Sequence, residues 1–214
     1  MMNSFDSKIE LEKCKVVLLG NSGVGKTSII NHLIKHEINE NEKPTLSANF
    51  FNIKLTIKEL NKIIDFDVWD TAGQEQYKSI AKFFYRDASI ALLVYDITDK
   101  KSFDEIKSYW LNQLKINSTK DIIICICGNK NDLYLNEKVN EIDARKFADS
   151  NNCEFTLISA KNGNGLFEIF QKLGKIYLDN DFRIQTENER KNRNGIKLKK
   201  STQKLTKEKK KSCC

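Results

Sequence analysis

A glycine-rich loop between an apolar run and an amphipathic stretch constrains the fold of this chain more than any other feature. The loop GNSGVGKTSII, residues 20–30, has the spacing of a phosphate-binding loop, with fixed positions at Gly20, Gly25, Lys26 and Thr27. Its glycines let successive backbone N–H groups turn inward around phosphate oxygens, and the following helix adds the positive end of its dipole. Lys26 then reaches the terminal phosphates and the Thr27 hydroxyl coordinates Mg²⁺. An ordinary tight turn would not require this strand and helix, so the loop predicts a nucleoside polyphosphate site lined by Ser22, Gly23, Val24, Gly25, Lys26, Thr27 and Ser28.

Short apolar runs alternate with amphipathic stretches along the first 178 residues. The predicted strands are 14–20, 50–57, 62–70, 89–96, 121–129 and 154–159, and the predicted helices are 27–36, 102–117, 141–152 and 164–178. Strands that alternate with helices form right-handed βαβ units, whereas the short link KELN after residue 57 fits an antiparallel hairpin. The predicted fold class is therefore α/β, with three layers, a six-stranded and mostly parallel sheet with one antiparallel strand, and helices on both faces.

The net charge of the protein lies at its C-terminal end. Residues 179–214 contain 12 Lys and Arg against 5 Asp and Glu, which accounts for the +7 of the whole chain. The apolar periodicity also stops near Leu178. We therefore expect a flexible N-terminal extension (1–12), one folded domain (13–178) and a disordered basic tail (179–214). No apolar run reaches the ~18 residues of a membrane span and no secretory signal is evident, which favours a cytosolic protein.

Two polar triplets indicate which nucleotide the loop binds. The first triplet ends the strand 121–129 and supplies Asn129, Lys130 and Asp132, at the edge where open α/β sheets bind ligands. The Asp132 carboxylate can accept both N1–H and the 2-amino group of guanine. Adenine offers no such donor pair, and an unpaired buried carboxylate costs ~1–3 kcal/mol or more. The second triplet is Ser159, Ala160 and Lys161, where a backbone N–H can contact guanine O6. Either triplet alone is weak, but together with the loop they predict a guanine nucleotide.

The motif WDTAGQE at residues 69–75 supplies the remaining elements of a phosphate switch. Asp70 can hold the hydration shell of Mg²⁺, the Gly73 N–H can contact a γ-phosphate, and Gln74 can orient an attacking water. Upstream, Pro44 is the only proline of the chain and directs Thr45 toward the metal. Segments that are held only when the γ-phosphate is present form a two-state element. The predicted metal-binding residues are Thr27, Thr45 and Asp70.

These residues resemble the small GTPases of the Ras superfamily and, within it, the Rab family. The resemblance covers residues 13–178 and rests on WDTAGQE, YRDASIALLVYDIT, GNKNDL and SAK, with a basic tail that ends in Cys213 and Cys214. The runs TLSANF and CICGNKNDL are similar to the early-endosomal branch, the Rab five and Rab twenty-one type.

The resemblance implies a P-loop G domain that binds GTP or GDP with Mg²⁺ and hydrolyses GTP slowly unless a GTPase-activating protein assists. It implies that Gln74 and Lys26 are catalytic and that Thr45 and Gly73 anchor the two switches. It also implies exchange factors, a Rab escort protein, a GDP dissociation inhibitor, and effectors that bind the switch regions. The resemblance also implies an aromatic patch that effectors recognise. For Trp69 and Phe84, simple burial in the core is the alternative interpretation. The patch residues are Phe50, Trp69 and Phe84.

Four positions depart from the family pattern. Ile38 stands where the family usually has a Phe that contacts the guanine ring. Because an aromatic contact contributes ~0.5–1.5 kcal/mol, we expect faster GDP release, which Ile38→Phe should slow. Gln76 replaces a basic residue and bears on recognition by exchange factors or GTPase-activating proteins. Ser47 leaves effector identity open, whereas Ser22 occupies a position where Rab proteins often carry Ser.

The tail segment 191–211 has ten basic residues against one acidic residue. A solvated charge run, a nucleic-acid site and a membrane-binding segment are the three possible interpretations. The resemblance favours the third and excludes nucleic acid, because CysCys endings of Rab-like proteins carry geranylgeranyl groups, here on Cys213 and Cys214. Two lipid chains and a polybasic segment anchor a protein stably to an anionic membrane surface.

We therefore expect a GTP/GDP switch that recruits effectors to the cytoplasmic face of intracellular membranes in vesicle trafficking, with the endosome favoured and a cytosolic, inhibitor-bound pool. A GTP-binding scaffold with little useful hydrolysis is the first alternative. A metabolic nucleotide kinase is the second, and it is disfavoured by the guanine triplet, by the lipid-type tail and by the lack of an arginine-rich lid.

Overall fold

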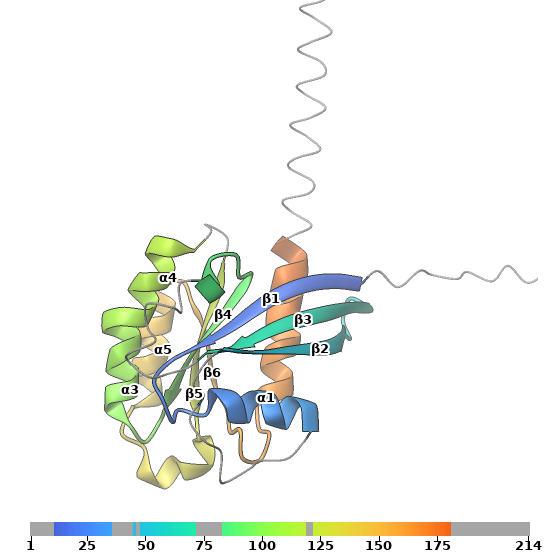
Figure 1. Cartoon of the computed structure of the whole chain (residues 1–214). Coiled ribbons are helices and arrows are strands. Elements are labelled where there is room, and N and C mark those ends of the chain that lie inside the picture. The colour runs from blue at the N-terminus through green and yellow to red at the C-terminus, as the bar shows by residue number, and fades with distance from the viewer. Residues whose placement is uncertain (1–10, 36–44, 46–47, 72–82, 119–121, 181–214) are drawn as a thin grey trace, which may run out of the picture. The chain divides into compact units, whose positions relative to one another are not determined.

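A computed structural model of the chain describes residues 11–35, 45, 48–71, 83–118 and 122–180. Its strands are β1 (Leu11–Leu19), β2 (Asn49–Ile57), β3 (Lys62–Asp70), β4 (Ile90–Asp96), β5 (Ile123–Asn129) and β6 (Glu154–Leu157). Its described helices are α1 (Lys26–Lys35), a helical turn over 83–85, α3 (Lys100–Glu105), a π-helical segment (Ile106–Trp110), α4 (Leu111–Asn117), a 3-10 helix (Asn131–Asn136), α5 (Glu141–Ser150) and a helix over 166–180 (Figure 1). The π-helical segment joins α3 and α4 into one continuous helical stretch over 100–117, where the sequence predicts a single helix over 102–117.

The six strands form one sheet in the order β2-β3-β1-β4-β5-β6. Only the β2–β3 pair is antiparallel, and all other neighbours are parallel. The predicted α/β class, the mostly parallel six-stranded sheet and the hairpin are therefore confirmed. Because β1, β3, β4, β5 and β6 run in the same direction, the loops that follow them meet at one edge of the sheet.

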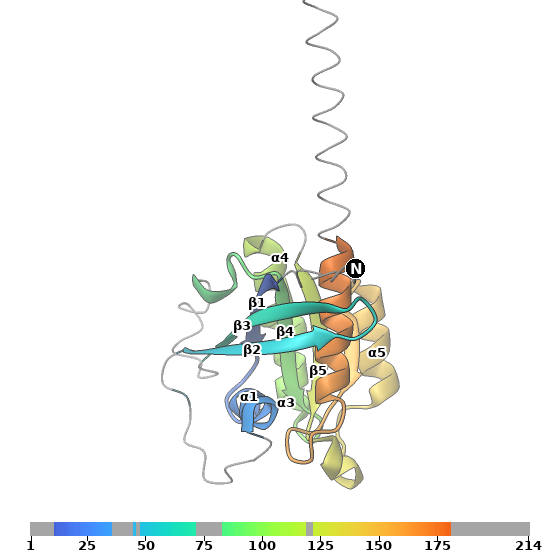
Figure 2. The ribbon, with the colours of Figure 1, turned by 90° about the vertical axis from the view of Figure 1, so that its right-hand side faces the viewer.

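Helices cover both faces of the sheet. On one face, Phe66 of β3 packs edge-on against Phe170 of helix 166–180, with 5.5 Å between ring centroids. The same helix approaches the hairpin so closely that a Cβ on Gly174 would lie 2.6 Å from Ile57 Cδ1. Figures 1 and 2 both show this helix crossing the strands β1, β3 and β2. On the opposite face, helices α3, α4 and α5 cover Val17 and the strand β4.

Several element boundaries differ from the predicted ones by a few residues, and two of them have a clear local reason. Strand β1 begins at Leu11, because Leu11 already pairs with Ile63 of β3, so pairing starts inside the segment predicted as an extension. Strand β6 ends at Leu157, since the Ser159 N–H donates to the Asn164 carbonyl and turns the chain. Strand β5 begins at Ile123.

Of the C-terminal segment 178–214, the structure describes only residues 178–180. Among the helices of the described part of the chain, none has the length and apolar character needed to cross a membrane.

Candidate nucleotide-binding site

The glycine-rich loop joins the end of β1 to the start of α1, and its backbone fits only glycine at two positions. Gly20 has φ +144°, and a Cβ there would lie 2.1 Å from the Val94 carbonyl oxygen. Gly25 has φ +96°, and a Cβ there would lie 2.3 Å from Asn129 Nδ2. A side chain at either position would collide with β4 or with the end of β5, so the loop is held tightly against the carboxyl edge of the sheet.

Lys26 begins α1 and is almost completely buried, with 5% of its surface exposed. Its Nζ donates to the carbonyl oxygens of Gly20 and Asn21, each at 2.8 Å. Burial lowers the pKa of Lys26 to about 8, and the Asp70 carboxylate acts in the opposite direction. The ammonium group therefore lies inside the curve of the loop, where a phosphate anion would stabilise its charged form.

Three oxygen-bearing side chains from separate parts of the chain meet beside Lys26. The Thr27 hydroxyl donates to Asp70 Oδ2 at 2.6 Å and shares a 2.9 Å hydrogen bond with the Thr45 hydroxyl. The Thr45 hydroxyl lies 3.5 Å from the same carboxylate oxygen. Two hydroxyls and a carboxylate suit Mg²⁺, which takes oxygen ligands and keeps positions for water and phosphate. The described residues contain no group of three or more His, Cys, Asp or Glu side chains that would hold a metal elsewhere.

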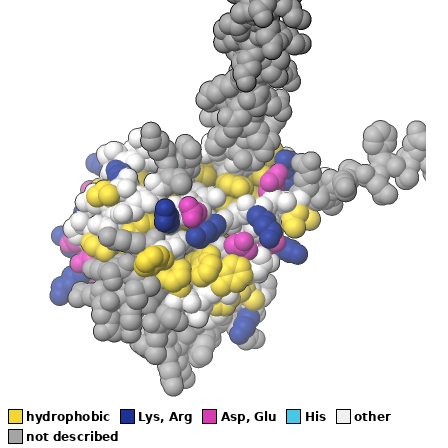
Figure 3. Space-filling model, turned by 45° about the horizontal axis from the view of Figure 1, so that its top comes forward, with side chains coloured by type: hydrophobic (Ala, Val, Ile, Leu, Met, Phe, Trp, Pro, Cys, Tyr) yellow, Lys and Arg dark blue, Asp and Glu magenta, His cyan; other side chains and the backbone are white. Residues whose placement is uncertain are grey.

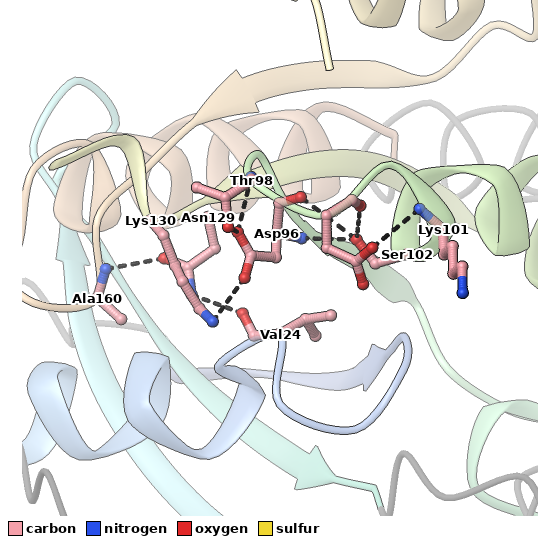
Figure 4. A network of polar contacts seen from close by, with 9 residues as sticks. Val24, Asp96, Thr98, Lys101, Ser102, Asn129, Lys130 and Ala160 are labelled. Atoms are coloured by element: carbon pink, nitrogen blue, oxygen red, sulfur yellow. Dashed lines mark hydrogen bonds and ion pairs between the residues drawn. The ribbon is translucent and has the colours of Figure 1, made fainter. Parts of the chain in front are cut away.

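Asn129, the last residue of β5, connects two loops of the site. Its side chain is buried, and its Nδ2 donates to the Val24 carbonyl at 2.8 Å. Its Oδ1 accepts from the Ala160 N–H at 2.9 Å (Figure 4). Because this one amide bonds to the phosphate loop and to the loop after β6, it fixes the two loops relative to each other.

Asp132 and Ser159 also lie together at this edge of the sheet. The buried Ser159 hydroxyl donates to Asp132 Oδ1, and the Asn131 N–H donates to the Ile158 carbonyl at 3.0 Å. The predicted guanine triplets are thus joined by hydrogen bonds, although they are separated by 27 residues in sequence. Lys161 is exposed to solvent next to them.

The remaining predicted site residues fall into two groups. Ser22 and Gly23 are exposed on the loop, whereas Ser28 is half-buried in α1. Ile38, Gly73 and Gln74 lie outside the described residues, as do Pro44, Ser47 and Gln76.

The three aromatic residues of the predicted patch lie in one row. Phe50 and Trp69 are cross-strand neighbours with ring centroids 5.3 Å apart, and Trp69 lies 5.4 Å from Phe84. Phe50 is 51% exposed, whereas Trp69 and Phe84 are half-buried, so neither is a fully buried core residue. The Lys15 ammonium lies 5.8 Å from the centroid of the Trp69 ring. Figure 3 shows hydrophobic side chains gathered on one face of the molecule, beside Lys or Arg side chains and acidic side chains.

Two site neighbours were missed by sequence reasoning. Asp96 ends β4 and forms a 2.6 Å ion pair with Lys130. The sequence could have indicated Asp96, because it ends a predicted strand at the same edge of the sheet as the other site residues. Trp110 donates from Nε1 to Asn21 Oδ1 of the phosphate loop at 3.4 Å, across 89 residues, and no local pattern predicts that contact.

Comparison with known proteins agrees with this geometry. The Ras family model matches residues 15–179. Human Rab-22A is 34% identical over 204 residues, which are 95% of this chain and 99% of that protein. Rab-21 of Geodia cydonium is 40% identical over 167 residues, 78% of this chain and 72% of that protein. Rab-5B of Plasmodium falciparum is 39% identical over 166 residues, 77% of this chain and 78% of that protein. The chain therefore belongs to the Ras family, is a Rab protein of the branch that includes Rab-5, Rab-21 and Rab-22, and is a GTPase.

Proposed function

We propose that this GTPase is a GTP/GDP switch that recruits effectors to endosomal membranes, with the nucleotide bound along the carboxyl edge of the sheet. The observation that carries the proposal is the Asn129 amide, which bonds to Val24 of the phosphate loop and to Ala160. That link sets the spacing between a polyphosphate and a guanine base.

The base-binding part of the proposal concerns the two triplets. The Asp132 carboxylate accepts N1–H and the 2-amino group of guanine, and the Ser159 hydroxyl orients that carboxylate by donating to it. The Ala160 N–H already donates to Asn129, so the loop that presents a backbone N–H to guanine O6 is held in place. Lys130 and Lys161 complete the base-binding set.

The phosphate-binding part concerns Lys26 and the hydroxyl–carboxylate group beside it. The residues from Ser22 to Ser28 surround the phosphates, and Lys26 neutralises their charge. Thr27, Thr45 and Asp70 would hold Mg²⁺, which supplies further charge neutralisation at the β- and γ-phosphates. Gly73 contacts the γ-phosphate, and Ile38 lies against the base in place of the family's aromatic residue.

Hydrolysis depends on Gln74, which orients the attacking water, and on Lys26, which stabilises the transition-state charge. No arginine is evident near the site in sequence, so the unaided rate is on the order of 10⁻⁴–10⁻³ s⁻¹, by analogy with Ras. A GTPase-activating protein would supply the missing stabilisation, and an exchange factor would release GDP.

The outputs of the switch are its effector surface and its membrane anchor. Effectors read Phe50, Trp69 and Phe84, which lie in one row and include the exposed Phe50 ring. Geranylgeranyl groups on Cys213 and Cys214, together with the basic tail, attach the protein to an anionic membrane surface. A Rab escort protein would deliver the chain for prenylation, and a GDP dissociation inhibitor would hold a cytosolic pool.

A single-turnover assay with γ-labelled GTP tests the switch. We expect Gln74→Leu to lower the intrinsic hydrolysis rate at least tenfold with GTP still bound, because the attacking water is no longer oriented. Gln76→Leu, two positions along in the sequence, is the matched control and should hydrolyse GTP at the wild-type rate. Wild-type hydrolysis by Gln74→Leu would reject the role of Gln74.

A further inference from the structure

Asp96 is a buried carboxylate at the end of β4, and the nucleotide-binding scheme above does not use it. Its residue surface is only 7% exposed, and it pairs in register with Asn129 of β5. Figure 4 shows Asp96 between the start of α3 and the Asn129–Lys130 segment. A charged group this deeply buried requires partners of its own.

The two carboxylate oxygens of Asp96 have separate partners. Oδ1 accepts from the backbone N–H of Thr98 at 2.8 Å and from the Thr98 hydroxyl at 2.7 Å. Oδ2 lies 2.6 Å from the Lys130 ammonium. The backbone N–H of Asp96 donates to the Ser102 hydroxyl of α3 at 3.0 Å. The carboxylate is therefore anchored to the β4–α3 turn through one oxygen and holds Lys130 through the other.

Lys130 is the residue on which this contact acts. Its backbone is in the left-handed region at φ 68°, which residues with a Cβ rarely adopt and which persists where the surroundings enforce it. It lies between Asn129 and Asp132 of the base-binding segment, and its carbonyl accepts from the Leu133 N–H at 2.8 Å. Because the contact with Asp96 fixes the side chain of Lys130, it also helps to orient the neighbouring guanine-recognition residues Asn129 and Asp132.

We propose that Asp96 is a positioning residue for guanine recognition, acting through Lys130. This inference rests on the proposed function, because it assigns Asp96 to the same base-binding site. The alternative is an ion pair that stabilises the fold without affecting the nucleotide. The pair Lys172–Glu154 has the same 2.6 Å separation and joins helix 166–180 to β6 away from the site, so it serves as the matched control.

The test is the GDP dissociation rate of the full chain, measured with a fluorescent GDP analogue. Asp96→Asn keeps the shape of the side chain but removes its charge, and we expect about tenfold faster release, since Lys130 loses the partner that holds it in place. The acceleration should be equal with Mg²⁺ and with EDTA, because Thr27 and Asp70 are not touched. Glu154→Gln should leave the rate unchanged.

Two further measurements separate positioning from simple stabilisation. In a Lys130→Ala background, Asp96→Asn should change the release rate less than twofold, since its effect passes through Lys130. Thr98→Val keeps the charge pair but removes one anchor of the carboxylate, and should give a smaller acceleration, of about threefold. This second variant keeps the test decisive if Asp96→Asn fails to fold.

Unchanged release in both Asp96→Asn and Thr98→Val, or an equal effect of Asp96→Asn in the Lys130→Ala background, would overturn the inference while leaving the guanine site intact. A wild-type protein that retains no guanine nucleotide would overturn the proposed function itself.

Discussion

At the scale of single residues, the site depends on close contacts between residues far apart in the sequence. Gly25 and Asn129 touch so closely that any side chain at position 25 would displace the amide that links the two loops. The sequence motifs identify both residues, because each belongs to a pattern with a known spacing. Their contact is not predictable, since it depends on the order of β1, β4 and β5 in the sheet.

Gly25→Ala should therefore destabilise the nucleotide-free protein by ~1–3 kcal/mol more than Gly23→Ala does, because the displaced Asn129 amide loses its bond to Val24. Both glycines have positive φ, at +96° and +79°, but a Cβ on Gly23 would meet nothing within 4 Å. Chemical unfolding in EDTA gives the two free energies of unfolding. Equal destabilisation by the two variants would mean that backbone strain alone constrains the loop.

At the scale of helices and strands, the sequence predicts where each element lies better than where it begins. Each strand is a short apolar run next to a turn, so all six were located. The early start of β1 was hidden by the polar residues Glu12 and Lys13, which are tolerated there because the strand pairs with β3. The π-helical segment was not predicted, because it depends on longer hydrogen bonds such as that from the Leu111 N–H to the Ile106 carbonyl.

Burial should also make the thiols of four cysteines unreactive. Burial raises the pKa of Cys14 to about 12 and that of Cys153 to about 11, and raises the values of Cys125 and Cys127 as well. Because the thiolate is the reactive form, we expect these four cysteines to resist iodoacetamide at pH 8 in the native protein and to react after denaturation. Mass spectrometry of the alkylated peptides measures this directly.

The raised thiol pKa values also set a direction for stability against pH. The folded state keeps these protons at pH values where the unfolded thiols, with pKa ≈ 8.5, have lost them. The free energy of unfolding should consequently fall as the pH rises from about 9 toward 11. A serine at position 153 should weaken this dependence, and rapid native alkylation of the four cysteines would contradict the buried assignment.

At the scale of the whole molecule, one folded unit carries the candidate site, and the net charge lies in the tail. The fold class and the family could be predicted because several motifs occur in a fixed order along the sheet. The roles of Ile38, Gly73 and Gln74 depend on segments outside the described residues, so they stay predictions.

Replacing Cys213 and Cys214 by serine should move the protein from membranes to the cytosol, because the basic tail alone lacks the apolar chains needed for stable anchoring. Fractionation of cells that express the variant measures the membrane-bound share. Ser212→Ala is the matched control and should stay on membranes. Persistent vesicle association of the double serine variant would reject the lipid anchor.

The most direct test of the central claim is to denature the purified protein and identify the nucleotide it releases by chromatography. The proposed guanine site predicts GDP or GTP in a molar amount close to that of the protein. ATP in that amount would contradict the assignment of Asp132, and an empty site despite added Mg²⁺ and GTP would contradict the proposed switch.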